Sequence, residues 1–207
     1  LCMSGLFIAR EGIDGCGKST QADRLRSYLE SKGEQVELLR EPGGTALSEQ
    51  IREILLNPNN DKMDPSTESI LLSASRAQLT REIIIPALER GNVVICDRYA
   101  DSTLAYQGYG RGINLEWLEK LNAFATAGLK PDITLLVDLP VDEALNRMQS
   151  KSFARIEMEG IEFLDKVRSG YLELTDRFSK RYFMIDGMET IEEMSKKIIN
   201  KSSITHS

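Results

Sequence analysis

Five short apolar runs occur along the chain, and longer segments with helical periodicity separate them. Mainly apolar runs of three to five residues are typical of strands that are buried on both faces of a sheet. Strands that alternate with helices predict an α/β fold, here a five-stranded parallel sheet with helices on both faces. The predicted strands are Leu6–Ala9, Val36–Leu39, Val93–Cys96, Ile133–Val137 and Phe183–Ile185.

Between the strands, apolar residues recur at the spacing of amphipathic helices. Gly33 follows the first helix as a stop signal. Ser66 is the expected N-cap of the third helix, with Glu68 in its first turn, and Pro86 is expected to bend that helix. Trp117, the only tryptophan, is expected in the core. The predicted helices are about Lys18–Ser31, Ala46–Leu56, Ser66–Arg90, Leu115–Thr126, Val141–Met148, Gly160–Phe178 and Thr190–Lys201.

Composition narrows the class of protein. The 207 residues show neither internal repeats nor a low-complexity linker, so we expect a single domain over residues 1–207, with a disordered tail at about 202–207. The formal net charge of -6 argues against a nucleic-acid-binding protein. The only histidine, His206, lies in the tail, which argues against a Ser-His-Asp mechanism and a histidine zinc site.

The cysteines and the lengths of the apolar runs indicate the cellular compartment. Three cysteines without a C-x-x-C pair are typical of free thiols in a reducing compartment. The N-terminal apolar run ends at Arg10, which is too short for a signal peptide, and no other apolar run approaches the length of a membrane span. We therefore expect a cytoplasmic protein without a membrane partner.

The residues after the first strand match the phosphate-binding pattern G-x-x-x-x-G-K-[ST]. Its glycines let the backbone turn tightly and present N–H groups to a polyphosphate. Lys18 can reach the β- and γ-phosphates, the Ser19 hydroxyl can hold Mg²⁺, and the following helix points its positive end at the anion. Strand, loop and helix together predict a nucleotide site formed by Gly12, Ile13, Asp14, Gly15, Cys16, Gly17, Lys18, Ser19 and Thr20.

Charged residues follow the second and third strands, at the sheet edge where α/β proteins bind ligands. The second strand leads into Glu41, and the next helix carries Arg52. The third strand leads into Asp97 and Arg98. In a P-loop protein an acid at the Asp97 position helps to hold Mg²⁺ or its waters, although a helix cap or a surface acid is the alternative. Arg98 can bind a phosphate bidentately.

Two segments have unusual compositions. Residues 101–112 combine two tyrosines with Gln107, Arg111 and three glycines, which favours a ligand site over an ordinary loop. Residues 147–159 are basic and little patterned, and they include Arg155. Late in a P-loop fold this indicates a lid that closes on ATP, with a solvated loop as the alternative.

In this order the motifs resemble those of bacterial thymidylate kinases, and the resemblance covers about residues 5–200. The combination of E-P-G-G-T, D-R-Y and A-Y-Q-G is far more specific than the P-loop alone. The segments that carry the resemblance are residues 11–20, 40–45, 75–78, 97–99, 105–112, 155–157 and 162–172.

The resemblance implies a P-loop NTPase-type three-layer fold and a kinase that moves the γ-phosphoryl group of ATP to dTMP, giving ADP and dTDP. It also implies Mg²⁺ as cofactor, and a homodimer formed through helices beside the sheet. Such chemistry needs positioning and positive charge more than covalent work by the protein, so the lack of a catalytic histidine is expected. The catalytic set is Lys18, Arg98, Arg155, Asp97 and Glu41.

The resemblance also assigns the site residues. Lys18 would hold the ATP phosphates, Ser19 and Asp97 would hold Mg²⁺ partly through water, and Glu41 would order that water or the arginines. Arg98 would bridge the donor and acceptor phosphates. The remaining contacts to dTMP would be Arg52 on the phosphate, Asp14 near the sugar 3′-hydroxyl, Tyr106 against the 2′ position, and Arg76, Thr103 and Gln107 facing the thymine.

Three positions depart from the family pattern. Leu72 stands where an aromatic residue usually stacks on thymine, so we expect weaker dTMP binding without loss of specificity. Ala154 replaces the usual acid of the lid. Gly15 stands where some members have a P-loop arginine, so the catalytic cation is expected from the lid. Arg155 is the first choice, with Lys151 and Arg147 as helpers.

Two other functions remain open from the sequence. One is another P-loop nucleoside or nucleotide kinase. The other is a P-loop nucleotide-binding switch or scaffold without kinase turnover. A GTPase-type switch would need an Asn-Lys-x-Asp signature, and the nearest match, residues 200–203, lacks the acid.

Overall fold

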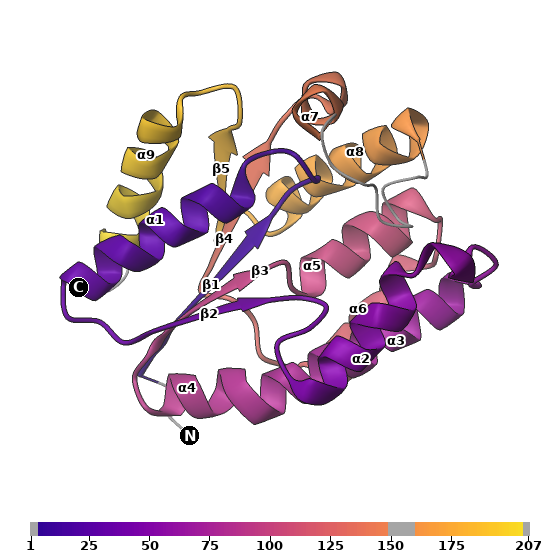
Figure 1. Ribbon diagram of the computed structural model, residues 1–207, viewed down its shortest axis with the longest axis horizontal. Helices are drawn as coiled ribbons and strands as arrows, with labels where there is room; N and C mark the ends of the chain where they lie inside the picture. Colours follow the sequence, from indigo (N-terminus) through magenta and orange to yellow (C-terminus); the bar gives the residue numbers. More distant parts are fainter. Residues whose placement is uncertain (1–3, 149–159, 205–207) are drawn as a thin grey trace.

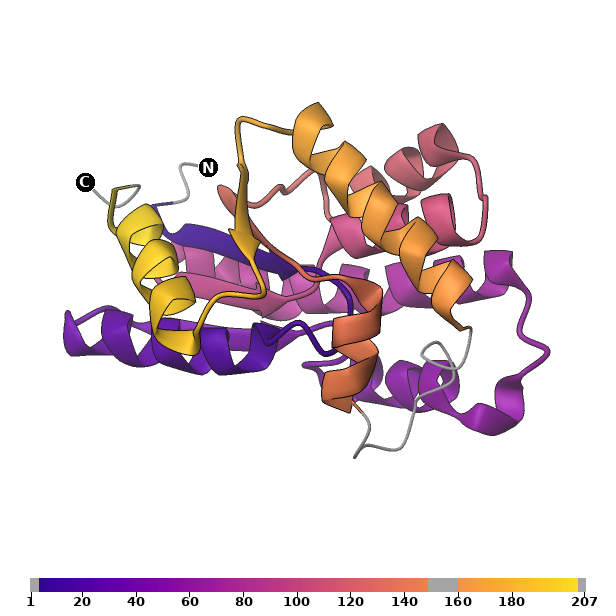
Figure 2. The same ribbon diagram turned by 90° about the horizontal axis from the view of Figure 1, so that it is seen from above.

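A computed structural model describes residues 4–148 and 160–204 of the chain (Figures 1 and 2). Within these residues five strands form one parallel sheet, as predicted, and their order is β2-β3-β1-β4-β5. The strand that leads into the P-loop lies at the centre. The strands are β1 (Leu6–Glu11), β2 (Val36–Arg40), β3 (Val93–Asp97), β4 (Ile133–Asp138) and β5 (Tyr182–Asp186).

Each strand extends beyond its apolar run to a charged residue. Arg10 and Arg40 are both in register with Asp97, and Asp138 is in register with Asp186. Because all the strands are parallel, these charged ends meet at one edge of the sheet. This edge carries the P-loop and the connections that follow β2 and β3.

Helices cover both faces of the sheet (Figure 1). Leu25 of α1 and Met194 of α9 pack with Ile8 on one face, whereas Leu79 and Leu88 belong to the cluster on the other. Figure 2 shows α1 and α9 side by side. The helices are α1 (Lys18–Ser31), α2 (Ala46–Leu56), α3 (Pro65–Leu79), α4 (Ile85–Glu89), α5 (Ala100–Thr103), α6 (Leu115–Ala125), α7 (Val141–Met148), α8 (Ile161–Arg177) and α9 (Ile191–Ile204).

The third predicted helix has a different N-cap from the one predicted, and a π-helical segment divides it. Its N-cap is Asp64, whose side chain accepts a hydrogen bond from the Ser66 backbone N–H, so the prediction of Ser66 as the cap was wrong. The Asp64 carboxylate and Pro65 at the first helical position form a stronger start signal than a serine. Residues Thr80–Ile84 form a π-helical segment, η2, between α3 and α4. Pro86, the second residue of α4, lacks the N–H that an α-helical ladder needs.

Residues 101–112, where the sequence left an ordinary loop as the alternative, are largely helical. Helix α5 runs into a second π-helical segment, η3 (Leu104–Gly110), which packs closely on α8. Two glycines permit this approach. A Cβ atom at Gly110 would lie 2.6 Å from the Phe163 ring, and one at Gly170 would lie 2.6 Å from the Tyr109 ring. The close packing brings α8 side chains to the carboxyl edge of the sheet.

Other predictions need correction. The Trp117 side chain is 41% exposed rather than part of the core. Helix α9 extends to Ile204, so the first residues of the predicted tail are helical, and residues 205–207 lie outside the described part. The same holds for residues 149–159 of the predicted lid. In the parts of the chain that are described, no helix is long and apolar enough to cross a membrane.

Candidate functional site

The P-loop connects β1 to α1 in a conformation that needs its glycines. Gly12, Gly15 and Gly17 all have positive φ, and a Cβ atom at Gly12 would lie 2.5 Å from the Val137 carbonyl oxygen. Lys18 Nζ donates to the carbonyl oxygens of Gly12 at 2.9 Å and Ile13 at 2.7 Å. The ammonium group is therefore folded back onto the loop, where it can be shared with a phosphate.

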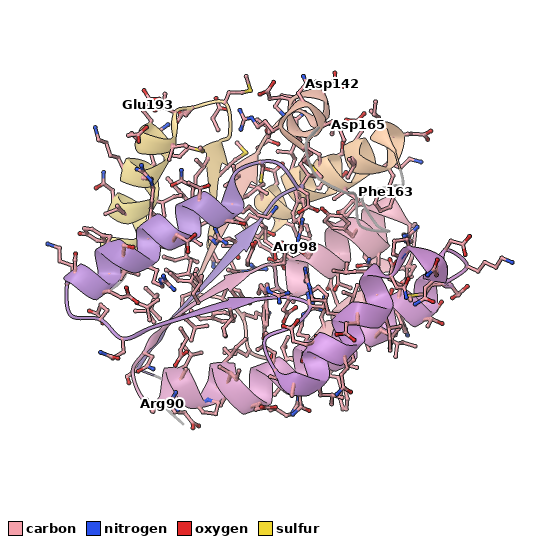
Figure 3. The ribbon with its side chains drawn as sticks, in the orientation of Figure 1. Arg90, Arg98, Asp142, Phe163, Asp165 and Glu193 are labelled. Carbon is pink, nitrogen blue, oxygen red and sulfur yellow. The ribbon has the colours of Figure 1, made fainter. Side chains whose placement is uncertain are left out.

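Arg98 joins the P-loop to the connection after β3. Its Nη2 donates to Asp14 Oδ1 at 2.8 Å and to the Tyr106 hydroxyl at 3.0 Å, while Nη1 lies 3.3 Å from the Tyr171 hydroxyl. Its backbone φ of 69° is in the left-handed region, which a non-glycine residue adopts only when its surroundings hold it there. Figure 3 shows Arg98 near the centre of the molecule, beyond the end of β3.

Asp14 and Arg98 stabilise the charged forms of one another. Burial raises the pKa of the Asp14 carboxyl, but Arg98 and then Lys18 outweigh it and lower that pKa to about 2. Burial lowers the pKa of Arg98, but Asp14 and the two tyrosine hydroxyls raise it overall. The guanidinium is thus a fixed positive charge between the P-loop and the neighbouring cavity.

Glu11 contacts the residues that surround Arg98, and the sequence analysis did not assign it a role. This fully buried carboxylate accepts from the Tyr99 backbone N–H at 2.9 Å, from Ser102 Oγ at 2.5 Å and from the Tyr171 hydroxyl at 2.8 Å. Burial and the nearby Asp101 raise the pKa of Glu11 overall, although the Ser102 bond, Arg98 and the Tyr171 bond lower it. Glu11 therefore fixes the hydroxyls of Ser102 and Tyr171, which both accept from Arg98.

One pocket lies beside the P-loop at the carboxyl edge of the sheet. The structure brings all eight predicted dTMP-contacting residues together in its wall, and Glu41 joins them. Three residues that the sequence analysis did not single out complete it: Pro42, Leu56 and Ser102. The predicted lining residues are Asp14, Arg52, Leu72, Arg76, Arg98, Thr103, Tyr106 and Gln107.

Arg76 is held in a single orientation within this pocket. Its Nε donates to Glu41 Oε2 at 2.7 Å, Nη1 to the Thr103 hydroxyl and Asn122 Oδ1, and Nη2 to the Tyr99 carbonyl oxygen. A guanidinium has five N–H groups, so its partners in the described residues leave one for a ligand. Burial raises the pKa of Glu41 to about 7, although Arg76 opposes this.

Asp97 does not line the pocket. Its Oδ2 lies 3.3 Å from Arg10 Nη2, while Oδ1 is buried without a hydrogen bond in the described part of the chain. Asp97 does not cap the helix that follows, because the N-cap of α5 is Tyr99, and the Asp97 side chain is 23% exposed. Ser19 and Thr20 are exposed in the first turn of α1. Arg155 and Lys151 lie outside the described residues, and Arg147 pairs with Glu143.

Comparisons with known proteins agree on one family. The family model described as thymidylate kinase matches residues 11–198. Curated proteins named thymidylate kinase from Kosmotoga olearia and Caldanaerobacter subterraneus are each 48% identical over 197 residues, which is 95% of this chain and 94% of theirs. One from Pseudomonas fluorescens is 47% identical with the same coverage.

Proposed function

The chain belongs to the thymidylate kinase family, and on that premise we propose how its residues divide the work of phosphoryl transfer from ATP to dTMP. The protein is a phosphotransferase, a dTMP kinase that forms ADP and dTDP. The observation that supports the proposal best is the gathering of the eight predicted dTMP-contacting residues in one pocket, next to the P-loop.

The donor phosphates bind over the P-loop. The backbone N–H groups at the start of α1 face the polyphosphate, and Lys18 exchanges its bonds to the Gly12 and Ile13 carbonyl oxygens for bonds to phosphate oxygens. Arg98 lies between the P-loop and the pocket, so its guanidinium contacts both substrates and compensates the charge that develops during transfer.

The residues present fit the Mg²⁺ ion that we propose as cofactor. A phosphate-bound Mg²⁺ keeps several waters and takes one or two protein carboxylates, so a dense cluster of acids is not required. The buried Oδ1 of Asp97 has no hydrogen bond in the described residues, and the Ser19 hydroxyl is exposed at the helix start. These two residues would hold the ion, which neutralises phosphate charge when bound. Glu41 serves the site by fixing Arg76.

The acceptor dTMP occupies the pocket. Arg52 contacts its phosphate, Asp14 and Tyr106 face the sugar, and the base lies towards Arg76, Thr103 and Gln107. Leu72 supplies only an apolar wall where a stacking ring would bind the base more tightly. We propose Arg155 as the lid cation that completes the site.

The family resemblance implies a homodimer formed through helices beside the sheet, and we propose that α2, α3 and α6 form its interface. These helices lie together in Figure 1, and each carries an exposed apolar side chain. Those of Ile54, Ile70 and Phe124 are 47%, 52% and 78% exposed. Exposed apolar side chains on neighbouring helices are the kind of surface that an interface buries. The free thiols of Cys16 and Cys96 support the cytoplasm as the compartment.

Label transfer tests this proposal. ATP labelled in its γ-phosphoryl group is incubated with dTMP, Mg²⁺ and the protein, and the products are separated. We expect the label in dTDP and an equal amount of ADP. Label that appears in inorganic phosphate, independently of dTMP, would show a hydrolase or switch instead of the proposed kinase site.

A further inference from the structure

A buried carboxylate holds the amide of Gln107. Gln107 Nε2 donates to Glu68 Oε1 at 2.8 Å, and both side chains are 1% exposed. Arg111 donates two hydrogen bonds to the same carboxylate, from Nε to Oε1 at 2.9 Å and from Nη2 to Oε2 at 3.2 Å. The Arg111 guanidinium also lies over the Phe163 ring, 5.2 Å from its centroid. Glu68 thus connects α3 to the π-helical segment η3 that carries Gln107.

The chemistry of the partners decides which way the amide points. An ionised carboxylate offers hydrogen-bond acceptors only, so it selects the NH₂ group of Gln107 and excludes the carbonyl oxygen. The Gln107 carbonyl oxygen therefore points away from Glu68, and it accepts no hydrogen bond from the described residues. Gln107 lines the pocket, so this oxygen is the polar group that it can offer there.

We propose that Glu68 is a specificity-determining positioning residue, which keeps the Gln107 amide turned so that its carbonyl oxygen faces the base. This inference rests on the proposed placement of the base beside Gln107. Arg76 presents its remaining N–H in the same pocket. The pocket thus pairs one donor with one acceptor, which matches the O4 acceptor and the N3–H donor of thymine. A cytosine edge has the opposite pattern.

The test compares two acceptors that differ only at this edge. 5-Methyl-dCMP keeps the methyl group, sugar and phosphate of dTMP but exchanges O4 for an amino group and N3–H for an acceptor. The measured quantity is the ratio of kcat/KM for dTMP to kcat/KM for 5-methyl-dCMP. The variant is Glu68→Gln. Its amide can accept from the NH₂ group of Gln107 or donate to the Gln107 carbonyl oxygen, so position 68 no longer imposes one orientation on the Gln107 amide.

We expect Glu68→Gln to lower that ratio by about tenfold, within the range of about 5- to 150-fold that one buried hydrogen bond spans. The KM for dTMP should rise while kcat at saturating dTMP changes by less than about threefold. A purely structural role would change kcat, or the turnover of both acceptors equally. An unchanged ratio in a folded Glu68→Gln protein would overturn the proposal.

Two comparisons complete the test. Glu116→Gln is the matched control, because Glu116 is also a first-turn glutamate, on α6, but is exposed and paired with Lys120; it should leave the ratio unchanged. Glu68→Asp keeps the negative charge but shortens the side chain by one methylene. It serves as the test if Glu68→Gln does not fold. It should lower the ratio of the two kcat/KM values less than Glu68→Gln does.

A failure of the proposed base placement is recognised separately. Gln107→Ala should raise the KM for dTMP by at least the effect of Glu68→Gln. If Gln107→Ala leaves both acceptors unaffected, the base does not lie beside Gln107 and the proposed placement is wrong. If Gln107→Ala weakens dTMP selectivity but Glu68→Gln does not, the placement holds and the role of Glu68 is refuted.

Discussion

Replacing Arg98 removes a cation that both contacts the P-loop and lines the acceptor pocket. Its guanidinium hydrogen-bonds to Asp14, Ser102, Tyr106 and Tyr171, so it needs no reorganisation when charge develops between the substrates. We expect Arg98→Ala to lower kcat by about 10³–10⁵, the range of arginine fingers in phosphoryl transfer. This corresponds to about 4–7 kcal/mol of lost transition-state stabilisation.

The same replacement has an effect that can be measured without turnover. Arg98 and Lys18 together lower the pKa of Asp14 to about 2. Without Arg98, Lys18 remains 3.7 Å away, so the Asp14 pKa should rise from about 2 towards its ordinary value of 3.8. A carboxyl ¹³C titration by NMR would follow this change. Because the pKa in the native protein is depressed, the stabilisation from Asp14 is present above its unfolded pKa and is lost as pH falls towards 2.

The assay couples ADP release to NADH oxidation at saturating ATP and dTMP. Arg98→Lys retains a charge but not the planar fork, so it should recover at least about tenfold of the lost kcat. Arg24→Ala is the control, because Arg24 pairs with Glu192 on the exposed side of α1 and should keep full activity. A folded Arg98→Ala protein with less than a tenfold loss of kcat would refute the assigned role.

Three further predictions concern the pocket and the helices beside it. Leu72→Phe should lower the KM for dTMP by about 2- to 12-fold, since stacking contributes about 0.5–1.5 kcal/mol, and an unchanged KM would contradict the stacking argument. Glu41→Gln should alter the pH dependence of unfolding: the Glu41 pKa is raised to about 7 from 4.5, so its stabilisation is full below 4.5 and is lost as pH rises through 7. Relative to Glu41→Gln, the native protein should lose about 3 kcal/mol of unfolding free energy from pH 4.5 to 8, and a constant difference would argue against that pKa. Phe124→Asp should convert the dimer to a monomer in sedimentation velocity. The control is Phe178→Asp, which should leave the dimer intact because Phe178 is half-buried against Tyr182. A native protein that sediments as a monomer would refute the dimer proposal.

Much of the architecture could be predicted because its signals are local. Apolar runs place the five strands, and the glycine spacing of residues 12–17 identifies a loop that the structure builds with three positive φ values. The pocket residues follow from family motifs on the connections that begin at the ends of β1, β2 and β3. Their convergence results from parallel strands, whose carboxyl ends share one edge.

The missed features depend on contacts between distant segments. Tyr171 contacts Arg98 across 73 residues, and Glu11 contacts Tyr171 across 160. Nothing near these residues in the sequence signals such a bond, although Glu11 is conspicuous as an acid at the end of a buried strand. The π-helical segments are not visible in a pattern built on a period of 3.6. The type of residue placed Trp117 in the core, but its position on α6 leaves the side chain 41% exposed.

The most direct test of the central claim is ADP release from ATP and Mg²⁺ with each candidate acceptor in turn: dTMP, dUMP, dCMP, AMP, GMP and thymidine. We predict the highest kcat/KM with dTMP, and little release with thymidine, because Arg52 and Arg98 then lack a phosphate to hold. A higher kcat/KM with AMP, GMP or dCMP, or ADP release that does not depend on any acceptor, would contradict the account.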